Sequence, residues 1–331
     1  MEAIVIADSS QVGEARRHAM ALSKRLGFTE TAVGQVGIVA TELAANLFRH
    51  GLGGELLIGG YEDETGSGFE CLALDKGPGM VNVERCLEDG FSTSGTSGTG
   101  LGAIARQSHV LDIFTQPSKG TAILVRISRD PKDHDRAMAR SGVVSVPYPG
   151  ETVCGDGHRL DRRTGGFSMM VSDGLGHGIY AAEASNAAVE TFNKLAGRPP
   201  AEIAQAMHVL LRKTRGAAVG IARFERDQGT VNYIGVGNVA AVILEVGGAR
   251  RMVSHNGTIG HTARRFQDFE YPVTVPFLMV LASDGLGTAW TLDAYPGLQS
   301  RHPSLIAGVL YRDFRRNRDD VTILIVREEG P

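Results

Sequence analysis

The sequence predicts an α/β (α+β) protein of two domains, in which sheets are layered with helices. Three observations predict this class. The chain has 331 residues, about twice the length of an average domain. Strand-sized apolar segments outnumber helix-sized ones, which is typical of sheets flanked by helices. Residues 128–142 are charged and weakly patterned, so we expect domains over 1–130 and 142–331 joined by a linker at 131–141.

The first domain is expected to begin with a short strand at residues 4–7. Ser10 is the expected N-cap of a helix that ends at Gly27, and a second helix is expected from about residue 31 to residue 50. A loop rich in Gly, Ser and Thr is expected at 91–98. The other elements expected in this domain are strands at 55–60, 69–74 and 121–127 and a helix at 101–108.

The second domain is expected to be richer in strands, with helices at about 180–195 and 200–213. The expected strands are 143–146, 167–171, 219–224, 231–236, 240–246, 277–282 and 321–326. Two of these strands, at 167–171 and 277–282, run into the same Ser-Asp-Gly-Leu-Gly sequence. One copy would read as a simple turn. Two aspartates placed alike at strand ends favour a shared site.

Charge and composition exclude several classes of protein. The chain carries 34 Lys+Arg and 37 Asp+Glu, a net charge of −3, so it lacks the basic surface expected of a nucleic-acid binder. We expect no membrane span, because no apolar run approaches 18 residues, and the first residues do not resemble a signal peptide. The three cysteines form no CxxC motif and no even framework. A cytoplasmic location is therefore expected.

Three groups of residues in the first domain suggest a ligand site. Glu42, Asn46 and His50 are spaced by four, which places them on one face of the expected helix. Asp75 follows an apolar strand and precedes a glycine-rich turn. The segment 98–102 opens a helix with glycines, where free backbone N–H groups can hold an anion. Taken singly, each group is equally consistent with a solvated helix face, a plain turn or a flexible loop.

In this order and spacing the motifs resemble the Bergerat-type ATP site of the GHKL superfamily, over about residues 10–127. ELAANLFRH is similar to its N box, DKGPGM to its first glycine box and GTGLG to its second. The resemblance implies an α/β sandwich that binds ATP and Mg²⁺. It implies that Asn46 holds the Mg²⁺ ion, that Glu42 is the base or orients the attacking group, and that Asp75 accepts a hydrogen bond from the adenine amino group.

The same resemblance implies the remaining nucleotide contacts. Residues 91–98 would form a mobile lid over the nucleotide. The other residues implied to bind the cofactor are Gly77 and Gly79 beside the base, Thr99, Gly100, Leu101 and Gly102 over the phosphates, and Thr121.

Within the superfamily the first domain is most similar to anti-sigma-factor and stressosome switch kinases, which phosphorylate Ser or Thr. The stretch EDGFSTSGTSGTGLGAIARQSHVLDIF carries this similarity. A sensor histidine kinase is not expected, because the sequence shows no membrane span and no upstream helix with an acceptor histidine. A GHKL motor ATPase is disfavoured, because no transducer domain follows.

Four acidic motifs in the second domain, each beside an expected strand, suggest a metal site. They contain Asp156, Asp173, Asp284 and the Asp319–Asp320 pair. Mg²⁺ and Mn²⁺ prefer oxygen ligands, and two such ions can activate water and hold a phosphate. Spacing alone does not join aspartates that lie 160 residues apart, and without further information four surface turns would be the favoured interpretation.

The sequences around these aspartates resemble PP2C-type metal-dependent phosphatases, in their SpoIIE/RsbX-like branch, over about residues 142–327. The similar segments are GVVSVPYPGETVCGD, VSDGLGHG, ASDGLG and RDDVTILIV. The resemblance implies a PP2C-like β-sandwich flanked by helices, with two Mn²⁺ or Mg²⁺ ions.

The resemblance also implies a role for each metal ligand. Asp173 would be the catalytic carboxylate that bridges both ions, with the carbonyl of Gly174 beside it. Asp284 and Asp319 would complete one metal site, and Asp156 would serve the other. Asp320 is expected to lie outside the ligand set.

Two departures from the PP2C pattern concern substrate chemistry. Leu175 stands where many members carry a histidine, and His177 lies two residues further on, so the acid that protonates the leaving group is unassigned. Glu151 lies in the region where many members carry a phosphate-binding arginine.

Together the two resemblances imply a bifunctional regulator, with an ATP-dependent Ser/Thr kinase domain and a metal-dependent Ser/Thr phosphoprotein phosphatase domain. The implied substrates are STAS-type antagonist proteins or stressosome proteins of a partner-switching pathway. Two alternatives stay open. The first domain could only sense ATP and ADP beside an active phosphatase, or the protein could act by binding a sigma factor or another regulator.

Overall fold

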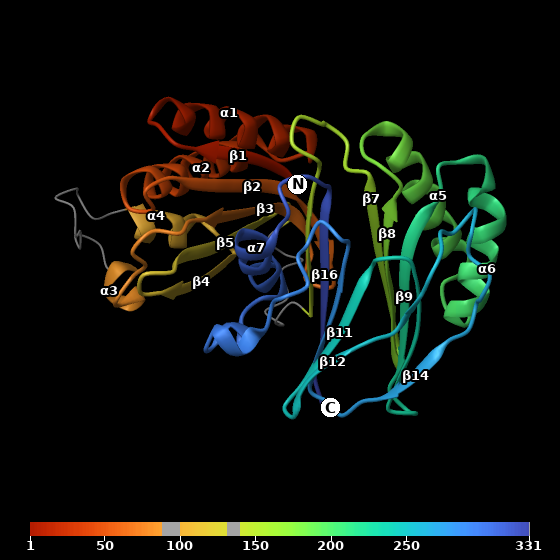
Figure 1. The fold of residues 1–331 in the computed structure, drawn as a ribbon. Helices are drawn as coiled ribbons and strands as arrows, with labels where there is room; N and C mark the ends of the chain where they lie inside the picture. Colours follow the sequence, from red (N-terminus) through yellow and green to blue (C-terminus); the bar gives the residue numbers. More distant parts are fainter. Residues whose placement is uncertain (88–99, 131–139, 331) are drawn as a thin grey trace. The chain divides into compact units, whose positions relative to one another are not determined.

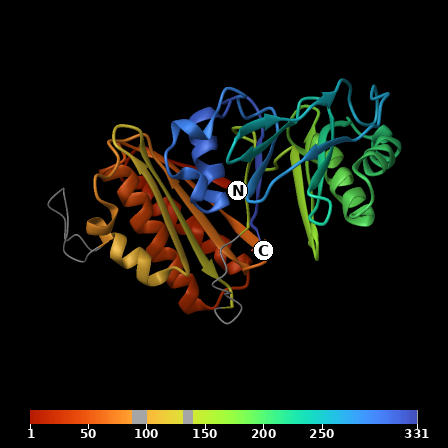
Figure 2. The same cartoon turned by 90° about the horizontal axis from the view of Figure 1, so that it is seen from below.

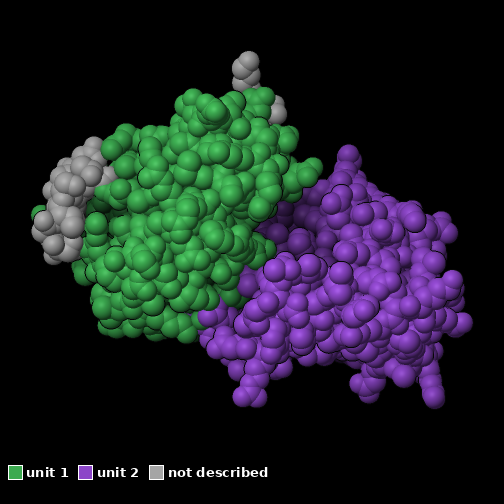
Figure 3. Space-filling view, turned by 90° about the horizontal axis from the view of Figure 1, so that it is seen from above, with its two compact units in different colours: residues 1–140, 292–312 green, residues 141–291, 313–331 purple. Residues whose placement is uncertain are grey.

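The computed structural model describes residues 1–87, 100–130 and 140–330 (Figure 1). It divides into two compact units, the first formed by residues 1–140 with 292–312 and the second by residues 141–291 with 313–331 (Figure 3). Three sheets, antiparallel in every strand pair but one, with packed helices confirm the predicted α/β class. The segment 292–312 belongs by its contacts to the first unit, although the sequence-based division left it in the second domain.

Unit 1 is built on a five-stranded sheet with the strand order β1-β2-β3-β5-β4, and every pair in it is antiparallel. Helices α1 and α2 lie along one face (Figure 2). Its strands and the helices of residues 1–130 are β1 (Glu2–Ile6), α1 (Ser10–Arg25), α2 (Glu30–Arg49), β2 (Gly54–Asp63), β3 (Gly66–Leu74), α3 (Val83–Leu87), α4 (Gly100–Gln107), β4 (Val110–Gln116) and β5 (Gly120–Ser128).

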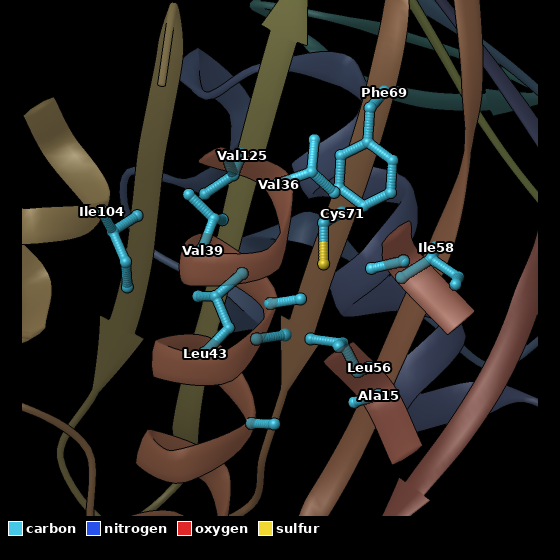
Figure 4. Close-up of a cluster of buried hydrophobic side chains, with 14 of the residues drawn as sticks. Ala15, Val36, Val39, Leu43, Leu56, Ile58, Phe69, Cys71, Ile104 and Val125 are labelled. Atoms are coloured by element: carbon cyan, nitrogen blue, oxygen red, sulfur yellow. The ribbon is translucent and has the colours of Figure 1, made fainter. Parts of the chain in front are cut away.

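The core of unit 1 lies between α2 and the sheet (Figure 4). Val39 and Leu43, one helical turn apart on α2, face Phe69 and Cys71, which alternate on β3. All four side chains are fully buried. This packing fixes α2 against β3. It thereby fixes the position of the polar side chains of α2 relative to Asp75, the residue after β3. Among the described helices, only α2 is long and apolar enough to span a membrane. Its packing in this core explains that length and composition.

The expected N-cap of α1 was wrong by one residue. Ser10 is the first residue of the helix, and Ser9 takes the cap position without a side-chain cap hydrogen bond. The Ser10 hydroxyl instead donates to Asp8 Oδ1 over 2.6 Å. Gly27, at φ +81°, follows the helix end as predicted, because this left-handed conformation suits glycine.

Strand β4 was not predicted. It lies at the edge of the sheet, next to β5, and its sequence VLDIFTQ is only partly buried. Asp112 interrupts its apolar pattern, and this residue accepts hydrogen bonds from Arg301 and from the backbone of His302. Since those partners lie about 190 residues away, the local sequence offers no signal for the strand.

The face of the sheet opposite α1 and α2 packs with residues 292–312, which contain η2 (Leu292–Ala294), η3 (Leu298–Ser300) and most of α7 (Pro303–Phe314). Every residue of α7 from Pro303 to Arg312 is buried. A helix that is buried on all sides has no amphipathic period, and for that reason α7 was missed in the sequence.

A buried network of charges joins this segment to the sheet. Arg126 on β5 donates to Glu70 over 2.6 Å, to Asp63 over 2.6 Å and to the Ser304 hydroxyl over 3.2 Å. Ser304 also donates to Glu70 over 2.9 Å. Breaking such a buried pair by removing one partner costs about 3–5 kcal/mol, because the other charge is left uncompensated. The network therefore favours one seating of the segment on the sheet.

Unit 2 is a sandwich of two sheets (Figure 1). One has the order β13-β10-β9-β8-β7 with β14 beside β10, and the other β12-β11-β15-β16-β6. Phe167, Phe224 and Phe277 fill the core, and the last two rings lie 5.1 Å apart. The strands are β6 (Ser141–Val146), β7 (Asp156–Arg163), β8 (Gly166–Gly174), β9 (Ala217–Glu225), β10 (Thr230–Val236), β11 (Ala240–Glu245), β12 (Gly248–Arg251), β13 (Ser254–His255), β14 (Phe269–Pro272), β15 (Phe277–Ala282) and β16 (Val321–Glu328).

Helices α5 (Ile179–Leu195) and α6 (Pro200–Leu210, continued by η1, Leu211–Lys213) pack on the first of these sheets around a second core. Both helices were predicted. Strand β7 was not, because its sequence DGHRLDRR is mostly polar. It lies at the sheet edge, where polar side chains are tolerated, and its pairing with β8 brings two of the acidic motifs together.

Candidate functional site

A cavity of about 490 Å³ opens in unit 1 between α2, β3, β5 and the start of α4. It brings together six of the residues predicted to bind nucleotide: Asn46, Asp75, Gly79, Gly100, Leu101 and Thr121. Its other lining residues are Leu43, Leu47, His50, Ala73, Pro78, Met80, Val81, Asn82, Arg85, Cys86 and Ile123. A largely apolar pocket with a few polar groups is typical of a small-molecule site.

Asp75 is held in one orientation at the end of β3. Its Oδ1 accepts backbone N–H bonds from Gly77 over 2.8 Å and from Thr121 over 3.1 Å. This arrangement leaves Oδ2 as the oxygen that can accept a hydrogen bond from a ligand. Burial raises the pKa of Asp75, and the two backbone donors oppose that rise by stabilising the carboxylate.

The glycines around Asp75 are explained by close backbone packing. A Cβ on Gly120, whose φ is +93°, would lie 2.1 Å from the Asp75 carbonyl oxygen. A Cβ on Gly77 would meet the backbone of Gly51, and one on Gly79 would lie 2.4 Å from the carbonyl oxygen of Gln116. These glycines let three loops close around Asp75. Close backbone packing is therefore a structural reason for glycine at these positions, in addition to the role in base binding that the resemblance implies.

The start of α4 lies against α2. A Cβ on Gly100 would be 2.8 Å from the Glu42 carboxylate and 3.8 Å from Asn46 Oδ1. A glycine-opened helix N-terminus therefore meets the two polar side chains that the sequence placed on one face of α2. This is the arrangement that the N box predicts for binding phosphate and a cation together.

Not every predicted nucleotide contact lines the cavity. Glu42 borders it through Gly100, whereas Gly77 and Gly102 do not line it. Thr99 and the expected lid at 91–98 lie outside the described residues. The sequence analysis did not predict the apolar residues that line the cavity. Only the alternation of side chains along β3 and β5 would have indicated them.

In unit 2, strand pairing brings the first two acidic motifs together. Asp156 at the start of β7 is directly opposite Asp173 near the end of β8. Burial and the neighbouring Asp173 raise the pKa of Asp156 well above its usual range. Burial and the charges of Asp284 and Asp319 raise the pKa of Asp173 to about 7, and burial and Asp284 raise that of Asp319 to about 6. Acidic groups from four distant motifs therefore share one site.

Several polar groups that the sequence analysis did not select hold these carboxylates. The Ser283 hydroxyl donates to Asp156 Oδ2 over 2.6 Å and accepts from the backbone N–H of Thr322. The Asn238 amide donates to Asp284. The serine before Asp284 in the repeated Ser-Asp-Gly-Leu-Gly sequence was the one available signal for such a supporting residue.

Asp320 lies closer to the site than expected. It is 2% exposed, its Oδ1 accepts the backbone N–H of Tyr148 over 2.8 Å, and its Oδ2 is buried with no hydrogen-bond partner among the described residues. Oδ2 also lies 2.7 Å from where a Cβ on Gly155 would be. A buried oxygen without a donor is costly unless a cation or donor joins it.

These observations fit a divalent cation. The donors are carboxylate oxygens, their charges repel one another, and Asp320 Oδ2 has a free lone pair, which suits a hard cation such as Mg²⁺ or Mn²⁺. Across residues 1–87, 100–130 and 140–330, no three acidic, histidine or cysteine side chains already converge tightly enough to enclose an ion. The predicted ligands Asp156, Asp173, Gly174, Asp284 and Asp319 therefore remain a proposal.

A polar cluster lies beside these carboxylates. His177 Nδ1 is 2.8 Å from Glu151 Oε1, and its ring stacks on Tyr148 at 4.3 Å between centroids. Tyr148 is the residue whose backbone binds Asp320. The structure thus brings together the two departures from the PP2C pattern, Glu151 and His177.

We expect the metal-stripped chain to lose stability as pH rises from about 4 to about 7. In this window Asp173 and Asp319 bind more protons in the folded than in the unfolded state, because their pKa values are raised on folding, so the free energy of unfolding falls with pH. Denaturant titrations in EDTA at several pH values measure the slope. The Asp284→Asn variant, which removes one repelling charge, should show a shallower fall, and a slope equal to that of the wild type would contradict the assignment.

Comparison with known families identifies both halves of the chain. The family model described as Stage II sporulation protein E (SpoIIE) matches residues 163–329, about half of the chain. The model described as histidine kinase-like ATPase domain matches residues 5–127. The two matches include the candidate nucleotide pocket and most of the candidate metal site, respectively.

Two curated proteins of Bacillus subtilis (strain 168) are similar. Serine/threonine-protein kinase RsbT is 31% identical over 109 residues, which cover 33% of this chain and 82% of RsbT. Phosphoserine phosphatase RsbX is 27% identical over 101 residues, which cover 30% of this chain and 51% of RsbX. The chain therefore spans most of the kinase relative but only about half the length of the phosphatase relative.

Solved structures agree on the fold. A structure described under "The bacterial stressosome: a modular system that has been adapted to control secondary messenger signaling" has a TM-score of 0.53 at 26% identity, over 57% of this chain and 98% of that one. The PP2C phosphatase domain of SpoIIE from Bacillus subtilis, with a fragment of its regulatory domain, has a TM-score of 0.50 at 17% identity, over 96% of this chain and 94% of that one. The latter likeness shows the fold alone.

Proposed function

The chain belongs to the stage II sporulation protein E (SpoIIE) family and carries an N-terminal histidine kinase-like ATPase domain; from this premise we propose that it is a bifunctional partner-switching regulator. One activity transfers phosphate from ATP to a protein Ser or Thr, and the other removes phosphate from a phosphoprotein. The observation that carries the proposal is that one chain holds both a nucleotide-sized cavity at Asp75 and a cluster of buried or partly buried, mutually repelling carboxylates around Asp173.

In the kinase reaction the described residues bind and orient the nucleotide. Asp75 Oδ2 accepts a hydrogen bond from the adenine amino group, and the apolar walls of the cavity exclude water from the base. Asn46 holds the Mg²⁺ ion that accompanies ATP. Glu42, beside the start of α4, orients the attacking hydroxyl and accepts its proton. The helix N-terminus at Gly100 binds phosphate oxygens through its backbone N–H groups.

For the phosphatase reaction Asp173, Asp284 and Asp319 would hold one divalent cation, and Asp156 and the carbonyl of Gly174 would help Asp173 to hold a second. Two Mn²⁺ or Mg²⁺ ions would supply a water of lowered pKa as nucleophile and would bind the phosphate oxygens. Ser283 and Asn238 orient the carboxylates by donating hydrogen bonds to Asp156 and Asp284.

We assign the proton for the leaving oxygen to His177. Glu151 fixes its ring through Nδ1, which leaves Nε2 to donate, and Tyr148 stacks against it at the edge of the metal site. His177→Gln should slow hydrolysis of phenyl phosphate by about 100-fold, because phenolate leaves poorly without a proton. Hydrolysis of p-nitrophenyl phosphate should slow far less, because its leaving group needs no proton.

Steady-state rates on the two esters, measured at fixed free Mn²⁺, check this assignment. The Glu151→Gln variant, which keeps a hydrogen-bond acceptor beside the ring but loses the charge, is the matched control and should show a smaller difference between the esters. Equal losses on both esters in His177→Gln would contradict a proton-donating role.

The bifunctional proposal is tested by incubating the purified chain with radiolabelled ATP and candidate STAS-domain proteins, with and without Mn²⁺. Label should appear on a Ser or Thr of the partner and should be released when Mn²⁺ is added. Release of phosphate from a prelabelled partner without any labelling by the chain would favour an ATP/ADP sensor beside an active phosphatase. A stable complex that needs neither reaction would favour a binding switch.

We propose STAS-type antagonists or stressosome proteins as the partners, with a sigma factor as an alternative, and a cytoplasmic location. This rests on the similarity to the RsbT and RsbX relatives and to the stressosome structure. The net charge of −3 also disfavours a nucleic-acid partner.

A further inference from the structure

Helix α7 belongs to both units of the molecule. Residues Pro303–Arg312 are part of unit 1, and the last two residues of the helix, Asp313 and Phe314, are part of unit 2. In the sequence the helix lies between two proposed metal ligands, Asp284 and Asp319. Successive turns of a helix are joined by backbone hydrogen bonds, so a change in the backbone at Arg312 can reach Phe314, two residues further along the same helix.

The unit 1 end of α7 reaches the nucleotide site. Arg312 Nη1 donates to the carbonyl oxygen of Asp75 over 2.9 Å, and Arg312 is 8% exposed. The Asp75 N–H is in turn bonded to the carbonyl oxygen of Thr121, which also lines the cavity. The guanidinium therefore holds the backbone of the residue whose carboxylate is proposed to bind adenine.

The segment before Arg312 is firmly seated in unit 1. The backbone N–H of His302 donates to Asp112 over 2.8 Å, and Ser304 joins the buried network with Glu70 and Arg126. Gly308 lies against the side chains of Leu72 and Leu74, about 3.3 Å from where its Cβ would be. Because a packed interior transmits strain, a change in β3 or in the turn after it is passed on to the helix.

The unit 2 end of α7 is bonded to the loop after Asp284. The N–H of Gly287 donates to the carbonyl oxygen of Phe314 over 2.8 Å, and the N–H of Arg316 donates to that of Gly285 over 2.7 Å. Gly285 is the residue directly after Asp284. Two residues after Arg312, the chain is therefore bonded to the backbone that carries a proposed metal ligand.

We propose that Arg312 is a positioning residue of the nucleotide site and that α7 transmits nucleotide occupancy to the backbone that carries Asp284. This inference rests on the proposed function, because it requires a nucleotide at Asp75. When adenine binds the Asp75 carboxylate, the carbonyl of the same residue and its Arg312 partner are fixed. The fixed helix then orders the hydrogen bonds at Gly285 and Gly287. Nucleotide acts in this way only if it prefers one of two arrangements of α7.

The proposal is tested by hydrogen–deuterium exchange on the full chain, with and without saturating Mg·ADP, read at the amides of Gly287 and Arg316. Calorimetry with Mg·ADP measures binding in the same samples. In the wild type, ADP should slow exchange at these amides about fivefold or more, as expected for a coupling between two sites. In Arg312→Gln, ADP should still bind, more weakly, but the slowing should be lost.

The matched control is Arg301→Gln, which removes an arginine of the same segment that bonds to Asp112 with a half-exposed side chain. It should keep the slowing, because a surface ion pair contributes little to the seating of the segment. Arg312→Lys, which keeps the charge but changes the reach, replaces Arg312→Gln if the latter does not fold, and it too should lose the slowing.

The outcomes separate the inference from the proposed function. Absence of any ADP binding in the wild type would overturn the nucleotide site and the inference with it. Normal ADP binding with unchanged exchange at Gly287 and Arg316 would overturn the inference alone. Full wild-type slowing in the Arg312 variants would assign the coupling to another element and would also overturn it.

Discussion

Asp173→Asn is expected to abolish dephosphorylation of p-nitrophenyl phosphate and of any phosphoprotein substrate, while binding of ADP stays unchanged. Asp173 is opposite Asp156 in the strand register, and burial together with the charges of Asp284 and Asp319 raises its pKa to about 7, so it lies within the acidic cluster. An amide in its place lacks the negative charge that would help to hold the divalent cations. Without them the water and the phosphate lose their common anchor.

We expect the rate to fall at least about 1000-fold, which corresponds to about 4 kcal/mol of transition-state stabilisation. Steady-state hydrolysis at fixed free Mn²⁺ gives the rate, and calorimetry with ADP shows that unit 1 is intact. Asp227→Asn, at an exposed turn of unit 2, is the matched control and should keep full activity. Wild-type hydrolysis by Asp173→Asn would refute the assignment of the metal site.

Asp75→Asn has the complementary effect: nucleotide binding should be lost and the phosphatase retained. Asp75 Oδ1 is occupied by the N–H groups of Gly77 and Thr121, so one oxygen is left for adenine. An asparagine must direct its NH₂ group either at those two donors or at the adenine amino group, and either choice leaves buried donors facing each other. Each such mispairing costs about 1–3 kcal/mol.

The measurement is calorimetric titration with Mg·ADP, and we expect affinity to fall about 100-fold, which corresponds to about 2.7 kcal/mol. Asn46→Ala provides a second test, since it should weaken binding in Mg²⁺ more than in EDTA. Asp227→Asn again serves as the control. If both variants bound nucleotide as the wild type does, ATP would have to bind elsewhere. If Asp75→Asn lost phosphatase activity in an assay that contains no nucleotide, the substitution would have disturbed both units.

The candidate sites were predictable to different extents. The candidate nucleotide site was assigned through the resemblance of its motifs to those of the GHKL superfamily, and these motifs are local in the sequence. Glu42 and Asn46 share a helix face at a spacing of four, and Asp75 and Gly79 belong to one turn after a strand. The candidate metal site also depended on a resemblance, because strand pairing joins only Asp156 to Asp173, and Asp284 follows a strand of the other sheet.

By itself, the sequence determined the elements with a clear period or a local stop signal: the helices α1, α2, α5 and α6 and the apolar strands that end in Asp-Gly. Only the tertiary structure decided which acidic motifs meet. The edge strand β7 is mostly polar and shows no strand pattern in its own sequence, so it is recognised as a strand only by its pairing with β8. It also decided where residues 292–312 belong. Helix α7 is buried on nearly all sides, and its polar contacts, Ser304 with Glu70 and Arg312 with Asp75, cross more than 200 positions of the chain, so no local signal could reveal the segment that completes unit 1.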